Sequence, residues 1–97
     1  MSEADAKAPI VRDLAIINQR GLHARASAKF VQLAGSYDAV IEVEKDGTTV
    51  GGTSIMGLMM LAASPGCSIR VSVSGPQAED AMRAIEELIA NRFGEEI

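Results

Sequence analysis

The sequence predicts a small α/β (α+β) protein: a two-layer, open-faced sandwich in which three helices cover one face of a four-stranded antiparallel sheet. Segments of period-two alternation and segments of helical periodicity follow one another in the order β-α-β-β-α-β-α. The first and last helical segments carry an apolar stripe on one side only, so each needs a single apolar surface to pack on. The clearest strand also has one apolar and one polar face, which suits a sheet that is covered on one side.

Turn and cap residues separate these periodic segments. Asp46-Gly47 is a signal for a tight hairpin. Gly35 is suited to cap the first helix and Pro76 to start the last one. The predicted elements are a strand over residues 10–17, a helix over 24–34, a strand over 39–44, a short strand ending near 52, a helix over 54–61, a strand over 69–74 and a helix from Pro76 to about 89.

The length of 97 residues favours a single domain. Residues 1–9 are rich in Ala, Asp, Glu and Lys and end in Pro9, so we expect a flexible N-terminal leader there and the domain over residues 10–97. No stretch approaches membrane-spanning length, and the leader has no signal-peptide apolar run. Cys67 is the only cysteine, which fits a reducing compartment. We therefore expect a cytoplasmic protein that does not contact a membrane. We also expect it to be a monomer.

The composition argues against several classes of ligand. A net charge of −4 lacks the clustered Lys and Arg that a phosphate backbone requires, and an aromatic content of 3% leaves little for base stacking. No nucleic-acid partner is therefore predicted. No His/Cys cluster with ligand spacing is present in the sequence, so we predict neither a metal site nor a cofactor.

The single histidine, His23, lies between a Gly-containing loop and a predicted helix start. Unpaired N–H groups and partial positive charge at a helix N-terminus bind phosphate. Arg25 adds a mobile guanidinium two residues further on. An imidazole can act in turn as nucleophile and leaving group. This pattern suits reversible phosphoryl transfer, although in an arbitrary protein such a histidine is more often a surface residue that caps a helix.

Two motifs carry a resemblance to a known family. The segment GLHAR at residues 21–25 is similar to the active-site motif of HPr, the histidine phosphocarrier of the bacterial phosphotransferase system. The segment SIMGLM at residues 54–59 is similar to the second HPr signature, around its regulatory serine. The two occur in the family's order and at a family-like separation. The predicted order of elements fits the HPr fold over residues 11–93, nearly the whole chain.

The resemblance implies a specific chemistry. His23 would accept a phosphoryl group on Nδ1 from enzyme I, the phosphoenolpyruvate-dependent kinase, and pass it to a histidine of an enzyme IIA-type protein. Arg25 and the backbone amides of Ala24 and Arg25 would hold the phosphate. The chain would be a relay substrate and not an enzyme. Many family members have Pro where this chain has Ala26, followed by Ser27. Because Ala is the best helix former, we expect the helix to form without that Pro.

Ser54 and the short Met-rich helix after it have two interpretations each. By resemblance, Ser54 is a regulatory phosphorylation site for an HPr kinase/phosphorylase, yet serine is also a favoured helix N-cap, which alone would explain it. Ile55, Met56 and Met59 would lie outward and, by resemblance, form the docking patch for enzyme I and enzyme IIA. The commoner outcome for such a Met stripe is burial in the core.

Two rival functions stay open on the sequence. One is a purely regulatory binding protein controlled at Ser54. The other is an independent enzyme with a histidine nucleophile, which would need a substrate pocket that so short a chain has little room for. Within the HPr family, the 54–61 run and the Phe93-Gly94-Glu95 ending slightly favour the nitrogen-regulatory branch over the sugar-uptake branch.

Overall fold

The computed structural model describes residues 8–95 of the chain. Seven of the nine residues of the predicted leader, residues 1–7, lie outside this range. The observed order of elements confirms the predicted fold class. The elements are β1 (Ile10–Ala15), α1 (Ala24–Gly35), β2 (Val40–Lys45), β3 (Thr48–Gly51), α2 (Ile55–Met60), β4 (Ser68–Ser74), α3 (Ala78–Ala90) and the short 3₁₀ turn η2 (Arg92–Gly94).

The four strands form one antiparallel sheet in the order β1-β4-β2-β3. β4 is central: it pairs with β1 in the register Ile10↔Val73 and with β2 in the register Ile41↔Val73. The Asp46-Gly47 turn joins β2 to β3, and both residues have positive φ, as the predicted tight hairpin requires. Because the last strand of the chain lies between the first two, residues from both halves of the sequence meet in one sheet.

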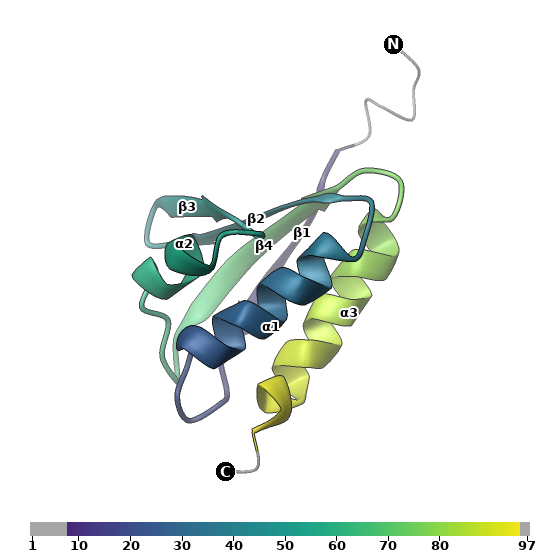
Figure 1. Cartoon of the computed structure of the whole chain (residues 1–97). Helices are drawn as coiled ribbons and strands as arrows, with labels where there is room; N and C mark the ends of the chain where they lie inside the picture. Colours follow the sequence, from purple (N-terminus) through teal and green to yellow (C-terminus); the bar gives the residue numbers. More distant parts are fainter. Residues whose placement is uncertain (1–7, 96–97) are drawn as a thin grey trace.

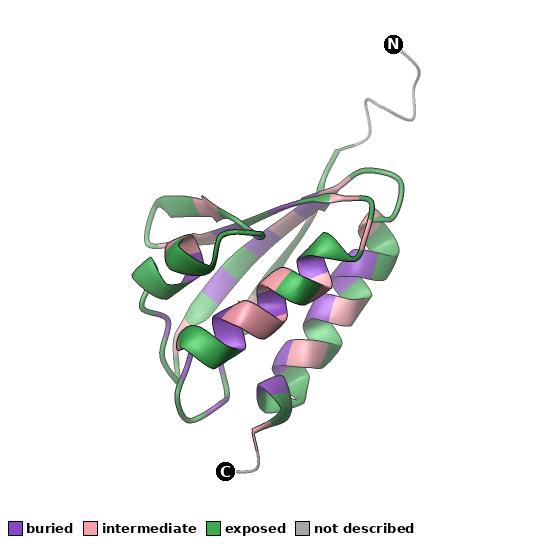
Figure 2. Ribbon diagram, viewed as in Figure 1, coloured by how far each residue is buried: buried purple, intermediate pink, exposed green. Residues whose placement is uncertain are grey.

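The helices cover one face of this sheet (Figure 1). Alternate residues of β2 and β4 point into that layer and are buried (Figure 2). α1 and α3 each bury one stripe against them, and α2 buries Leu58. Phe30 of α1, Leu58 of α2 and Ile85 of α3 are all fully buried at its centre. The core therefore lies between the helices and the sheet, as the one-sided patterning of the sequence predicts.

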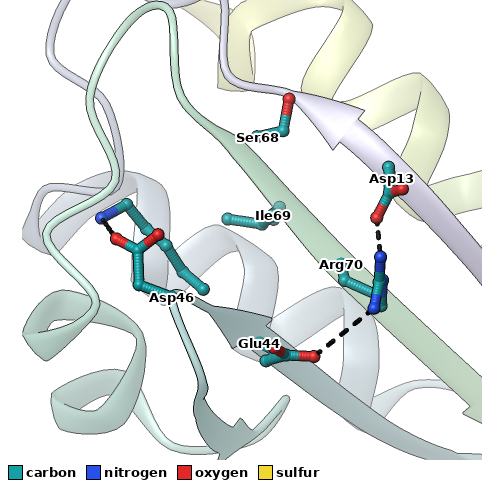
Figure 3. A pocket seen from close by; sticks show the side chains of 7 residues that line it. Asp13, Glu44, Asp46, Ser68, Ile69 and Arg70 are labelled. Atoms are coloured by element: carbon teal, nitrogen blue, oxygen red, sulfur yellow. Dashed lines mark hydrogen bonds and ion pairs between the residues drawn. The ribbon is translucent and has the colours of Figure 1, made fainter.

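The opposite face of the sheet is polar. Arg70 of β4 lies between Asp13 of β1, at 3.0 Å, and Glu44 of β2, at 4.0 Å (Figure 3). Exposed ion pairs of this kind contribute little to stability. A shallow hollow beside them is lined mainly by charged side chains. This cross-strand arrangement suits a solvated surface.

Several predicted boundaries differ from the structure. β1 ends at Ala15 and not at residue 17, because the chain turns there towards the loop before α1. Gly35 is the last residue of α1 and not its cap; Ser36 is the C-cap, in a right-handed conformation that needs no glycine. α3 begins at Ala78, two residues after Pro76. Such end shifts are small against the length of the elements.

Candidate functional site

His23 is the N-cap of α1, at the end of the loop that leaves β1. Its backbone is extended, with φ −74° and ψ −179°, as a capping residue requires. Its Nδ1 atom accepts a hydrogen bond from the backbone N–H of Arg25 at 3.3 Å. A ring nitrogen that accepts a hydrogen bond carries no proton, so in the neutral ring the proton is on Nε2. The local helix start thus holds Nδ1 as the unprotonated nitrogen.

The other ring nitrogen faces a carboxylate. Nε2 lies 2.5 Å from Oε1 of Glu95, which comes directly after the η2 turn, at the C-terminal end of the described chain. Both side chains are largely covered, with exposed fractions of 22% for His23 and 15% for Glu95. The two residues are 72 positions apart, so local periodicity could not pair them. The one signal in the sequence is Phe93, a large apolar residue in a polar C-terminal segment.

A buried asparagine also contacts this carboxylate. Nδ2 of Asn18 donates to Oε1 of Glu95 at 3.0 Å and to the carbonyl of Gly21 at 2.8 Å. The hydrogen bond from His23 is the largest cause of a lowered pKa for Glu95; the Asn18 hydrogen bond lowers it further, while burial raises it. Because this pKa is below its unfolded value, the contact stabilises the fold at pH values above the ordinary pKa of a glutamate and is lost as acid protonates Glu95.

The loop before His23 is fixed against the connection between α2 and β4. Gly21 has a φ of +62°, and a Cβ there would lie 2.1 Å from the carbonyl oxygen of Ala63. The N–H of Leu22 donates to that same carbonyl at 2.9 Å. Ser27 donates its hydroxyl to the carbonyl of Leu22 at 3.1 Å from within α1. These contacts fix the backbone of the loop directly before His23. The close approach to Ala63 and the positive φ explain why position 21 is a glycine.

The residues around His23 that the resemblance singled out occupy the first turn of α1. Ala24 and Arg25 are exposed, and Ala26 is buried. α1 is intact through Ala26 without the common proline, as expected. Among the described residues, no hydrogen bond or ion pair holds the Arg25 guanidinium.

Ser54 is the N-cap of α2. Its hydroxyl accepts from the N–H of Gly57 at 3.0 Å, and the side chain is exposed. The capping interpretation of the sequence is thus correct.

The Met-rich helix is divided between core and surface. Leu58 and Leu61 are buried, whereas Ala62 is exposed at a positive φ and the next residue, Ala63, is buried. Three residues expected outward lie outward. We call these, with a fourth that sequence reasoning missed, the α2 patch: Ile55, Met56, Met59 and Met60, with exposed fractions of 41%, 68%, 39% and 78%.

Two further features bear on chemistry. Within residues 8–95, no group of three or more His, Cys, Asp and Glu side chains could hold a metal ion. Cys67 lies immediately before β4; its thiol is half-buried, and hydrogen bonds with Ser64 lower its pKa.

Comparison with known proteins identifies the family. The family model described as "PTS HPr component phosphorylation site" matches residues 10–91. The phosphocarrier protein HPr of Cupriavidus necator is 51% identical over 84 residues, covering 87% of this chain and 94% of that one. The chain belongs to the HPr phosphocarrier family.

Solved HPr structures share the whole fold. An HPr from Thermoanaerobacter tengcongensis matches with a TM-score of 0.86 and 42% identity, covering 91% of this chain and 99% of that one. The HPr of Bacillus anthracis matches with a TM-score of 0.81 and 38% identity, covering 86% and 99%. Membership of the HPr family makes the chain a phosphocarrier of the phosphotransferase system. Among the described residues, no helix has the length and apolar character needed to span a bilayer.

Proposed function

We propose that this chain is a cytoplasmic, monomeric phosphoryl relay: His23 accepts a phosphoryl group on Nδ1 from phosphorylated enzyme I and passes it to enzyme IIA-type proteins. The observation that supports this most strongly is the position of Nδ1 at the N-terminus of α1, within hydrogen-bond reach of the Arg25 amide. The N-terminus of a helix favours an anion through its N–H groups and its dipole. A phosphoryl group on Nδ1 would take over the N–H that the bare nitrogen now accepts.

The transfer balances without any other reactant. The Nδ1 lone pair attacks phosphorus, the nitrogen–phosphorus bond of the donor phosphohistidine breaks, and the donor nitrogen keeps that electron pair. His23 becomes a phosphorylated, positively charged ring that retains its Nε2 proton. Passing the group to enzyme IIA reverses these events. The amides of Ala24 and Arg25, with the Arg25 guanidinium, would stabilise the charge on the moving group.

The test is incubation of the native protein with phosphoenolpyruvate and enzyme I. A carrier takes up one phosphoryl group per chain and releases no small phosphorylated product. An independent enzyme would instead turn over and release product, and a purely regulatory protein would take up no label. Comparison of the sugar-uptake and nitrogen-regulatory forms of enzyme I as donors assigns the branch.

Replacement of Arg25 by Ala is expected to slow phosphoryl transfer about tenfold or more, because a mobile guanidinium that meets the moving charge is lost. The thermal midpoint should hardly change, since Arg25 is exposed. Rapid-quench transfer assays with phosphorylated enzyme I measure the rate, and Arg83→Ala on the exposed side of α3 is the matched control. Equal rates for all three proteins would mean that the helix amides suffice.

The α2 patch supplies a candidate docking surface beside this site. α2 packs against α1, and the connection after α2 contacts the His23 loop through Ala63 (Figure 1). Exposed Met side chains adapt to more than one partner. We infer that enzyme I and enzyme IIA dock here, and that phosphorylation of Ser54 by an HPr kinase/phosphorylase weakens docking by placing hydrated charge in an apolar contact.

Ser54→Asp is accordingly expected to weaken binding to enzyme I about tenfold, because it introduces a charge into that contact and keeps a good N-cap. Ser54→Ala should bind normally and cost about 1 kcal/mol of stability through the lost cap. Met56→Ala should weaken binding through lost apolar area. Calorimetric titration against enzyme I measures the affinity of all three variants. If both Ser54→Asp and Met56→Ala bind with native-like affinity, α2 is not part of the interface.

A further inference from the structure

The C-terminal turn holds Glu95 next to Nε2 of His23, and it does so by contacts that do not involve His23. Phe93 is buried in the core with 1% of its surface exposed. Nζ of Lys29, in α1, donates to the Phe93 carbonyl at 2.6 Å. Arg92 and Phe93 both have left-handed backbones, with φ of 56° and 55°, which non-glycine residues adopt only when the surroundings enforce it. The turn therefore fixes the backbone before Glu95, so that its carboxylate lies beside Nε2 of His23.

Asn18 fixes the carboxylate itself. The side chain is fully buried, and its Oδ1 atom has no hydrogen-bond partner among the described residues. Burial of an amide with an unpaired oxygen is unfavourable. The two hydrogen bonds that Nδ2 donates, to Gly21 and to Glu95, offset this cost. Asn18 thus links the loop that carries His23 to the carboxylate that faces it.

We propose that Glu95, oriented by Asn18, is a positioning residue for phosphoryl transfer: its carboxylate keeps the His23 ring proton on Nε2 and so keeps Nδ1 as the nucleophile. This inference rests on the proposed relay function of His23. Glu95 acts through the histidine and does not touch the phosphoryl group. The two ring nitrogens are then held from opposite sides, Nδ1 by the Arg25 amide and Nε2 by Glu95.

The carboxylate also matches the charge that develops on the ring. When Nδ1 bonds to phosphorus, the ring becomes positively charged while the proton stays on Nε2. A carboxylate hydrogen-bonded to that N–H stabilises the cation, as a buried carboxylate does for a histidine base in acyl transfer. Glu95 is ionised at neutral pH, and the hydrogen bond from His23 lowers its pKa further below the ordinary range. No proton has to leave or enter the site during transfer in either direction.

The kinetic test compares Glu95→Gln with native protein, using phosphorylated enzyme I as donor. Gln keeps the size and an acceptor oxygen but removes the charge. Because hydrogen bonds to ionised groups are about twice as strong as neutral ones, we expect the maximal rate of transfer to fall about tenfold with an unchanged KM for enzyme I. Glu86→Gln on the exposed side of α3 removes the same charge elsewhere and should transfer like native protein.

A second measurement reads the ring directly and needs no partner. In protein with ¹⁵N-labelled histidine, every ring signal comes from His23. We expect a proton bonded to Nε2, none on Nδ1, and faster exchange of the Nε2 proton with water in Glu95→Gln. Asn18→Ala, if it folds by circular dichroism, should show the same faster exchange.

The outcomes separate the two claims. If native protein takes up no label from enzyme I, the relay function fails, and the inference fails with it. If native protein is labelled but Glu95→Gln matches its maximal rate, or if the ring proton is on Nδ1, the relay stands and the role of Glu95 is overturned. A rise in KM alone would place Glu95 in docking and would equally overturn it. If the Nε2 proton exchanges in Asn18→Ala as it does in native protein, Asn18 does not orient Glu95.

Discussion

His23→Ala is expected to fold and to accept no phosphoryl group from phosphoenolpyruvate and enzyme I. No other imidazole exists in the chain, so the nucleophile is removed outright. The cost to stability should be about 1 kcal/mol, because His23 caps α1 through one long hydrogen bond of 3.3 Å and contacts Glu95 at a partly covered site. The measurement is labelling to completion, followed by acid and base treatment. The native label should be acid-labile and base-stable, as a phosphoramidate is.

A second variant separates loss of the nucleophile from loss of the cap. Asn is among the best N-cap residues, so His23→Asn restores a side-chain acceptor for the first turn of α1 without an imidazole. We expect it to be more stable than His23→Ala and equally unlabelled. Full labelling of either variant would show that another residue carries the phosphoryl group and would contradict the proposed function.

Gly21→Ala is expected to cost about 3 kcal/mol of unfolding free energy. Two causes add. The backbone of Gly21 is left-handed, with φ +62°, which costs an L-residue roughly 1–2 kcal/mol. The new Cβ would lie 2.1 Å from the Ala63 carbonyl oxygen, and such overpacking costs about 1–3 kcal/mol. Relief of the contact would also break the 2.9 Å hydrogen bond from Leu22 to that carbonyl.

Gly47→Ala isolates the conformational cost. Gly47 lies in the β2–β3 turn with φ +83°, but a Cβ there would meet nothing within 4 Å. It should therefore cost only about 1–2 kcal/mol. Urea unfolding at equilibrium compares the two variants. If Gly21→Ala is no less stable than Gly47→Ala, the close contact between the His23 loop and Ala63 does not exist in solution.

Most of the fold could be predicted because local patterns determine it. Val71 and Val73 alternate with polar neighbours, and the stripe of α3 repeats at helical spacing, so strand, helix and covered face can be derived from the sequence. The errors lie at ends and turns. Gly35 looked like a left-handed cap but is an ordinary helical residue, since the C-cap Ser36 closes the helix with a right-handed backbone. The end of a helix depends on the path of the next segment, and the glycine alone does not determine it.

The site was only half predictable for a related reason. The His23–Arg25 contact spans two residues at a helix start, and a local motif marks it. Glu95 and Asn18 reach His23 only through tertiary structure: a left-handed turn after α3 and a fully buried amide. In the sequence, Asn18 is one more polar residue of a loop. Sequence periodicity cannot predict a contact between residues so far apart in the chain. The exposure of Met60 was missed for another reason: α2 has only six residues, fewer than two turns, so its buried and exposed sides are poorly defined by spacing.

The most direct test of the proposed relay is the position of the phosphoryl group on the histidine ring. Native protein with ¹⁵N-labelled histidine is phosphorylated with phosphoenolpyruvate and enzyme I, and coupling between phosphorus and the ring nitrogens is read by NMR. Because His23 is the only histidine, the assignment is unambiguous. We expect a single phosphorus–Nδ1 coupling, with the proton retained on Nε2. A coupling to Nε2, or phosphorus bound to no ring nitrogen, would contradict the relay through Nδ1.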